Sequence, residues 1–177
     1  RTLEELGAEG EWGREEYRRR IQTIKELEPA YEAHDSGRRA LREGNVEQAR
    51  EQARKALDME SGEAIFHALL GDSFAMEGRM EEAETAYSDA LERDDSWFYH
   101  HLRRGMVREN LGSLDGARTD LRRSLELLPT GDAHYYLGNV ERRTGNRRLA
   151  IEHYRTAAQA EGETGKRARE ALEQMGV

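Results

Sequence analysis

Three histidines recur at matching intervals along the chain and are the residues best suited to metal chemistry. His67, His101 and His134 are separated by 34 and 33 residues. Neutral imidazole is a good ligand for zinc and copper, so this repetition raises the hypothesis of a ladder of metal ligands. Side chains one structural repeat apart are usually too distant to share a metal ion, because bonds from zinc to nitrogen are only about 2 Å long. We therefore expect these histidines to fill a packing position, and His34 and His100 to lie at the surface or in a groove.

Apart from these histidines, the sequence contains no group of residues typical of a catalytic site. The absence of cysteine excludes disulfides, thiolate zinc sites and a thiol nucleophile. The motifs HExxH, GxxxxGK and GxSxG are also absent. Carboxylates are plentiful, but in charge-rich helices they usually form a solvated face with i,i+4 Glu–Arg pairs, each contributing roughly 0.2–0.5 kcal/mol. We therefore predict that this chain is not an enzyme and that it holds no cofactor and no metal.

Charge and hydropathy exclude further classes of partner. The chain carries 28 Lys and Arg against 36 Asp and Glu, a net charge of −8. Nucleic-acid binding depends on neutralising phosphates, so this balance disfavours it. No apolar run approaches the roughly 18 residues that cross a bilayer, and no signal peptide is present. We expect neither nucleic-acid binding nor direct membrane insertion, and look instead for a protein or extended-peptide partner.

The elements that position these residues follow from a fourfold internal repeat. Gly37, Gly71, Gly105 and Gly138 are spaced 34, 34 and 33 residues apart, and each is followed seven residues later by another glycine. Small residues then flank a position that is larger in three of the four copies, in the groups Ala49, Ala53 and Ala56; Ala83, Tyr87 and Ala90; Ala117, Leu121 and Ser124; Ala150, Tyr154 and Ala157. A repeat of this length predicts one pair of helices per copy. We expect the first glycine to permit close helix approach and the second to end the first helix in a left-handed conformation.

The second copy, with Leu70, Gly71, Phe74, Gly78, Ala83, Tyr87 and Ala90, resembles the tetratricopeptide repeat (TPR). The resemblance implies an all-α fold, a right-handed superhelix (α-solenoid) of four helix–turn–helix repeats with an N-terminal helix and a C-terminal capping helix. The expected order is a flexible linker over 1–13, an N-terminal helix over 14–29, repeats over 30–62, 63–96, 97–130 and 131–162, and a capping helix over 163–177. We expect the N-terminal helix to end at Pro29, because the residue before a proline leaves the helical region.

Three copies depart from the family pattern, and the first does so with Ser36 and Ala53 in place of larger residues. The third has Arg104 and Arg108 where a leucine and an aromatic residue are expected, and the fourth has Glu141 at that aromatic position. We expect the third copy to pack instead through a shifted apolar stripe of Leu102, Met106 and Val107.

In the TPR family, the first helix of each repeat lines a concave binding groove. Carried over position by position, the resemblance assigns this groove to Tyr31, His34, Arg38, Arg42, Ile65, Met76, Tyr99, Leu102, Met106, Asn110, Tyr135, Asn139, Arg142 and Arg143. An apolar middle between pairs of arginines suits an extended peptide, a partner protein or another part of the same polypeptide. The lysine and asparagine clamp that holds chaperone tails in this family is replaced in the first copy by His34 and Arg38, so we do not expect that ligand.

A narrower resemblance rests on five stretches, 13–17, 28–31, 64–72, 127–130 and 134–138. They are similar to the C-terminal TPR region of bacterial HExxH zinc metalloproteases, the group that includes beta-barrel assembly-enhancing proteases. The resemblance implies a non-catalytic recognition domain that docks in cis on an N-terminal protease domain in the periplasm. The chain begins with Arg1 rather than Met, as expected for a fragment of a longer protein. The alternative is a stand-alone cytoplasmic TPR scaffold or adaptor.

Overall fold

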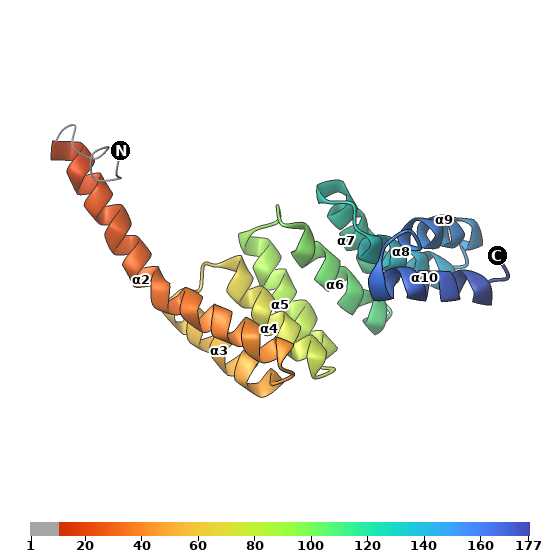
Figure 1. Ribbon diagram of the computed structural model, residues 1–177, viewed down its shortest axis with the longest axis horizontal. Helices are drawn as coiled ribbons and strands as arrows, with labels where there is room; N and C mark the ends of the chain where they lie inside the picture. The colour runs from red at the N-terminus through yellow and green to blue at the C-terminus, as the bar shows by residue number, and fades with distance from the viewer. Residues whose placement is uncertain (1–10) are drawn as a thin grey trace. The chain divides into compact units, whose positions relative to one another are not determined.

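The chain folds into helices joined by short turns (Figure 1). The computed structural model describes residues 11–177, with side chains from residue 18 onward apart from Arg20. Within that part of the chain every regular element is an α-helix. The protein divides into two compact units, an N-terminal unit over 1–62 and a C-terminal unit over 63–177, which are described separately. The prediction of an all-α fold is therefore confirmed.

The N-terminal unit is one helical hairpin. Helices α2 (Glu11–Arg42) and α3 (Val46–Met59) pack together through alanine-rich faces. Asn45 caps α3 by accepting a hydrogen bond from the backbone N–H of Gln48. Small side chains let the two backbones approach closely, and they are all buried in the structure: Ala30, Ala33, Ala40, Ala49, Ala53 and Ala56.

The expected break at Pro29 is wrong, because α2 runs through this proline without interruption. Lys25 and Pro29 are both exposed, so water reaches the Lys25 carbonyl that the proline leaves without its helical donor. Ala30 and Ala33 follow immediately and are buried, which holds the next turn in helical form. The expected linker over 1–13 is also wrong at residues 11–13, which belong to α2. The rest of that linker lies outside the described residues.

The C-terminal unit contains three hairpins and a final helix. The hairpins are α4 (Ala64–Met76) with α5 (Met80–Arg93), α6 (Phe98–Leu111) with α7 (Leu114–Leu127), and α8 (Gly131–Arg143) with α9 (Arg147–Ala157), followed by α10 (Gly162–Gln174). Contacts join α4 to α6, α6 to α8 and α8 to α10, so these four helices form one layer. Helices α5, α7 and α9 pair with α4, α6 and α8 and make a second layer.

The repeated glycines have the two roles that their spacing predicts. Gly78 ends the first helix of its hairpin with a φ of +77°, and the matching glycines of the other three hairpins also have positive φ. Gly71, Gly105 and Gly138 lie inside their helices, where an added Cβ would meet the partner helix. At Gly71 that atom would lie 2.8 Å from Cε1 of Tyr87, a ring with no exposed surface. The close approach of paired helices therefore depends on these glycines.

In the third repeat, Arg104 and Arg108 take part in the packing between the two helices. Leu102 and Val107 are buried, as expected for the shifted stripe. Arg104, however, donates two hydrogen bonds of 2.8 Å to the carboxylate of Asp120, and Arg108 donates a third of 2.9 Å. Asp120 is only 2% exposed. Burial alone would raise the pKa of Asp120, but its hydrogen bonds from Arg104 and the nearby His101 and Arg108 side chains hold it below the usual value.

The departure in the fourth repeat is explained by a charge exchange between neighbouring repeats. Arg108 of the third repeat donates to Glu84 of the second at 2.7 Å. At the corresponding positions one repeat later, Glu141 accepts from Arg118 at 2.8 Å. Glu141 is 1% exposed and also accepts from Asn146 at 2.6 Å. The same inter-repeat contact is thus made twice with the charges reversed.

Replacing Gly71 by alanine should lower the melting temperature, because the new methyl group would collide with the immobile Tyr87 ring. Overpacking of this kind costs roughly 1–3 kcal/mol, or a few degrees for a chain of this size. The matched control is Gly116→Ala in α7, where the nearest atoms are 3.2 Å away on the side chains of Arg108 and Ser113. Thermal unfolding followed by circular dichroism should show a lower melting point for the first variant only. Equal melting points would contradict the close-approach role.

Replacing Asp120 by asparagine should destabilise the protein by roughly 3 kcal/mol, because it leaves Arg104 and Arg108 without their buried counter-charge. Since folding lowers the pKa of Asp120, its contribution is complete above its usual pKa and declines as the pH falls through the folded value. Urea unfolding at pH 7 and at pH 3 should show a smaller difference between variant and wild type at the lower pH. A difference that does not depend on pH would argue against a charge-based role.

Candidate functional site

The histidines lie in several environments. His67 and His101 are buried, which confirms their packing role, whereas His134 is half-buried beside His153. The expectation of surface or groove positions for His34 and His100 is wrong, since they are 7% and 1% exposed. Ring carbons provide most of the imidazole surface, and the Nδ1 of His100 is satisfied by the Asp94 carbonyl, so burial carries little polar cost. Among the described residues no group of three or more histidines and carboxylates is placed to hold a metal ion.

The predicted groove residues are divided between the two units. Tyr31, Arg38 and Arg42 are exposed on α2 in the N-terminal unit, where His34 is buried. The remaining ten belong to the C-terminal unit, and nine of these are at least partly accessible.

Leu102 is the exception, and its assignment to the groove is wrong. It is 5% exposed and belongs to the hydrophobic core with Leu121, Leu137 and Val140. Position 104, where the family usually has a leucine, holds an arginine that pairs with Asp120. Leu102 provides the apolar core side chain on this helix instead.

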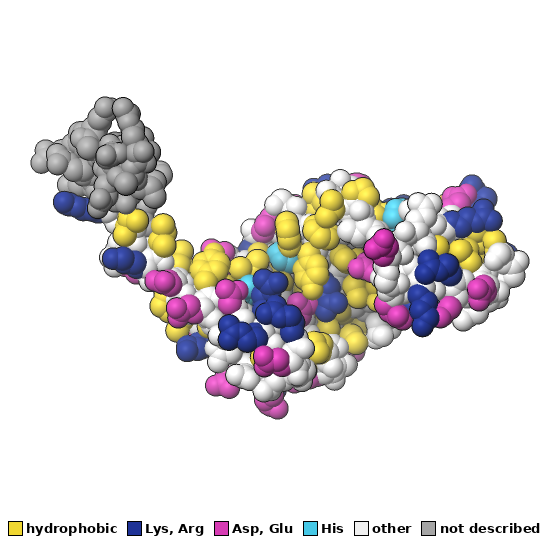
Figure 2. Space-filling model, in the orientation of Figure 1, with side chains coloured by type: hydrophobic (Ala, Val, Ile, Leu, Met, Phe, Trp, Pro, Cys, Tyr) yellow, Lys and Arg dark blue, Asp and Glu magenta, His cyan; other side chains and the backbone are white. Residues whose placement is uncertain are grey.

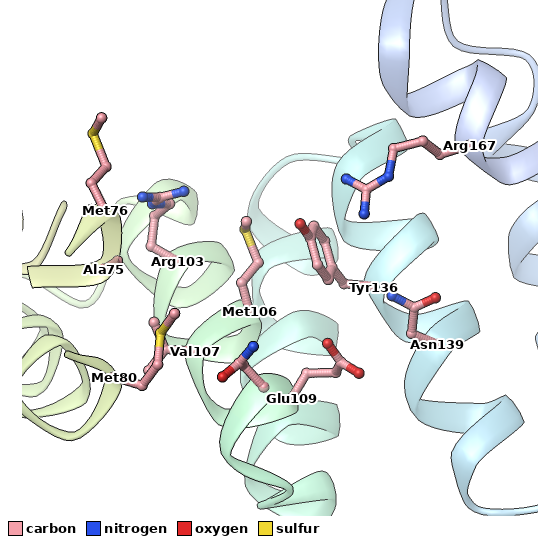
Figure 3. Close-up of a pocket in the computed structure, with 11 residues that line it drawn as sticks. Ala75, Met76, Met80, Arg103, Met106, Val107, Glu109, Tyr136, Asn139 and Arg167 are labelled. Atoms are coloured by element: carbon pink, nitrogen blue, oxygen red, sulfur yellow. The ribbon is translucent and has the colours of Figure 1, made fainter. Parts of the chain in front are cut away.

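An open pocket of about 400 Å³ lies in the C-terminal unit along the layer of α4, α6, α8 and α10. Four predicted residues line it, namely Met76, Met106, Asn110 and Asn139. The other lining residues are Ala75, Met80, Arg103, Val107, Glu109, Tyr136 and Arg167. Figure 3 shows Met106 and Tyr136 between Arg103 on one side and Arg167 on the other. The pocket therefore combines apolar side chains with polar and charged groups.

Arg103 is fixed in place by Asp72. Its Nε lies 2.8 Å from Oδ1 of Asp72 and 3.1 Å from the hydroxyl of Tyr87, which itself donates to Asp72 at 2.5 Å. Tyr99 approaches the same carboxylate at 3.3 Å. Burial, followed by the negative charge of Asp72, raises the pKa of Tyr87 well above its usual value, so the phenol remains a neutral donor. This arrangement connects one wall of the pocket to the core of the second repeat.

Arg167 comes from the final helix and is more accessible. Its guanidinium lies over the Tyr135 ring, 4.7 Å from the ring centroid, in a cation–π arrangement. Tyr135 is also stacked edge-on against Tyr136. The exposed cation is thereby held at the edge of the pocket.

A further edge of the pocket carries an ion pair. Arg143 donates to the side chain of Glu109 at 2.7 Å and also to the Glu109 backbone carbonyl. Asn139 accepts a hydrogen bond of 2.8 Å from the hydroxyl of Tyr154, which fixes the orientation of its amide. Arg143 therefore helps to position Glu109 and does not itself line the pocket.

Sequence reasoning missed four important lining residues: Met80, Arg103, Tyr136 and Arg167. Arg103 and Tyr136 each lie one residue beyond a predicted groove position, and a shift of one residue in helical register would have included them. Arg167 belongs to α10, outside the repeats, and no repeat position pointed to it. Figure 2 shows hydrophobic, basic and acidic side chains interspersed on the face in view, so side-chain type alone does not mark a binding surface.

Helical hairpins stacked in two layers, with an open pocket along one layer, define an α-solenoid repeat protein. The tetratricopeptide repeat family matches residues 34–96 and 102–168, and the chain belongs to that family. No curated protein sequence matches it. No helix of the described residues has the length and apolar character needed to cross a membrane.

Solved structures support the same fold. The TPR domain of Arabidopsis OM64 is 21% identical with a TM-score of 0.64, and the match covers 67% of this chain and 98% of that domain. A thermophilic TPR protein of Thermus thermophilus is 23% identical with a TM-score of 0.67 and 77% coverage of both chains. The second TPR domain of human RPAP3, solved with the HSP70 peptide SGPTIEEVD, is 26% identical with a TM-score of 0.62, covering 66% of this chain and 98% of that one.

Leu102→Ala should reduce the free energy of unfolding by roughly 2–5 kcal/mol, because it removes buried core volume. Met76→Ala should have little effect on stability, since its side chain is 51% exposed at the pocket. Urea unfolding of both variants checks this distinction. A small change in the free energy of unfolding for Leu102→Ala would instead support the assignment of Leu102 to the groove.

Proposed function

We propose that the C-terminal unit is a protein-interaction module whose pocket binds an extended peptide segment of a partner protein. The observation that carries this proposal is the open pocket along α4, α6, α8 and α10, which is lined by both apolar and polar side chains. Such a surface matches the common anatomy of peptide sites, in which apolar pockets receive side chains and polar groups fix the backbone.

The apolar part of the pocket is built largely from methionine. Met76, Met80 and Met106 come from three successive helices and all line it (Figure 3). Methionine is flexible and polarisable, so a surface made from it adapts to side chains of different shape. We expect the bound segment to place one or two apolar side chains here.

The polar part of the pocket suits the backbone and an acidic group of the ligand. The amides of Asn110 and Asn139 offer donors and acceptors to an extended main chain. Arg167 offers an exposed guanidinium that pairs well with carboxylates. Binding of an HSP70 peptide by the RPAP3 domain supports the use of this fold for peptide capture. We do not propose a chaperone tail as the ligand, because His34 and Arg38 replace the family's clamp residues.

The test selects peptides from a displayed random library on the wild-type protein and measures their affinity by fluorescence anisotropy. Met76→Glu should weaken binding at least about tenfold, because it places a negative charge among the apolar side chains that line the pocket. The matched control is Met59→Glu on α3, since Met59 is similarly exposed, at 48% against 51%, and does not line the pocket. Failure to select any peptide, or equal loss in both variants, would count against the proposal.

We also propose, from the resemblance of the five stretches alone, that the chain is the non-catalytic recognition domain of a bacterial periplasmic zinc metalloprotease. In that setting the pocket would receive substrates or assembly partners, and a protease domain would dock in cis. The gene sequence upstream of Arg1 decides the matter: it should encode a signal peptide and an HExxH helix. A start codon directly before Arg1 would favour a stand-alone cytoplasmic scaffold instead.

A further inference from the structure

Helix α2 extends well beyond the helix with which it packs. It has 32 residues against 14 in α3, and its buried side chains begin only at Ala30. No described side chain between 18 and 29 is buried. This projecting segment of α2, residues 18–29, therefore gains little burial from its hairpin.

An apolar stripe runs along the projecting segment. Ile21, Ile24 and Leu27 recur every three residues, which places them on one side of the helix. Ile24 is 62% exposed, and Ile21 and Leu27 are partly exposed. Ala33, which packs on α3, lies nine residues after Ile24 and so about half a turn around the helix from it. The stripe therefore points away from α3, and a row of exposed apolar side chains is typical of an interaction surface.

The charges of α2 are segregated along its length. Residues 18–25 include four basic residues and no acidic one, whereas residues 26–35 include four acidic residues and no lysine or arginine. The basic group is Arg18, Arg19, Arg20 and Lys25, and the acidic group is Glu26, Glu28, Glu32 and Asp35. An antiparallel second copy of this helix would place each group against its opposite, while a parallel copy in register would place like charges together. The charge pattern thus fits the helix to itself in one orientation.

Antiparallel pairing about the boundary between residues 25 and 26 satisfies the stripe and the charges together. Residues equally far from that boundary face each other, so Ile24 of each helix lies opposite Leu27 of the other. The same pairing brings oppositely charged residues of the two helices near each other, Arg18 with Glu32 and Lys25 with Glu28. All four of these charged side chains are exposed, and a two-fold axis makes every contact twice.

We propose that the projecting segment of α2 is a self-association surface, which pairs antiparallel with the same segment of a second copy of this chain. Three apolar side chains from each copy provide less buried area than a permanent dimer requires, so the chain exchanges between monomer and dimer as its concentration changes. The surface belongs to the N-terminal unit and is independent of the peptide pocket, which lies in the C-terminal unit.

Sedimentation equilibrium of the full chain over a range of concentrations tests the surface. The wild type should pass reversibly from monomer to dimer as the concentration rises. Ile24→Ser should weaken dimerisation at least about tenfold, because it removes the most exposed apolar side chain of the stripe. The matched control is Met59→Ser on α3, since Met59 is also exposed, at 48%, and lies outside the stripe. Circular dichroism verifies that both variants keep the helical content of the wild type.

Two charge-reversed variants test the orientation. One carries Arg18→Glu with Lys25→Glu, and the other carries Glu28→Lys with Glu32→Lys. Each variant alone should dimerise at least about tenfold more weakly than the wild type, because like charges then oppose each other, and an equimolar mixture should recover the wild-type affinity as a heterodimer. Parallel pairing would oppose like charges in the wild type and in both variants, so no such difference would arise. A wild type that stays monomeric, equal losses in the Ile24→Ser and Met59→Ser variants, or a mixture that fails to recover would overturn the proposal.

Discussion

The close approach of two helices at an internal glycine is the constraint on which the rest of the structure depends. Gly71, Gly105 and Gly138 each face a fully buried side chain of the partner helix, a tyrosine or a leucine. Because the hairpins close so tightly, their first helices line up in one layer, and α10 continues that layer. The pocket exists only because these first helices present successive side chains along the same face. Binding surface and packing are thus consequences of the same small residues.

Charged side chains perform much of the packing within and between repeats that apolar residues usually perform. Asp120 and Glu141 are almost completely buried, yet each is saturated with hydrogen bonds from arginine or asparagine. Such contacts are directional, and removal of one partner leaves a buried charge without compensation. The low apolar content of the chain is therefore compatible with an ordered interior. It also gives the repeat interfaces a dependence on pH that an aliphatic core would lack.

Most of the helices could be predicted from the sequence, because glycine spacing and small-residue positions report local backbone geometry. Side-chain partners were harder to predict. Arg104 and Arg108 depart from the pattern because they pair with Asp120 opposite them, and Leu102 belongs to the core beside them. Pro29 did not end its helix, because buried alanines beyond it outweighed the loss of one hydrogen bond. Arg167 reaches the pocket from outside the repeats, and only tertiary structure shows this.

The reversed ion pairs between repeats determine which repeats can be neighbours in this array. Arg108 meets Glu84 across one boundary, and Glu141 meets Arg118 across the next. If the third repeat were duplicated in tandem, the arginine at position 108 of one copy would face the arginine at position 118 of the other. Two like charges would then be confined at a boundary where each repeat needs an opposite one. The present order of the repeats avoids this repulsion, because it places an arginine opposite a glutamate at both boundaries.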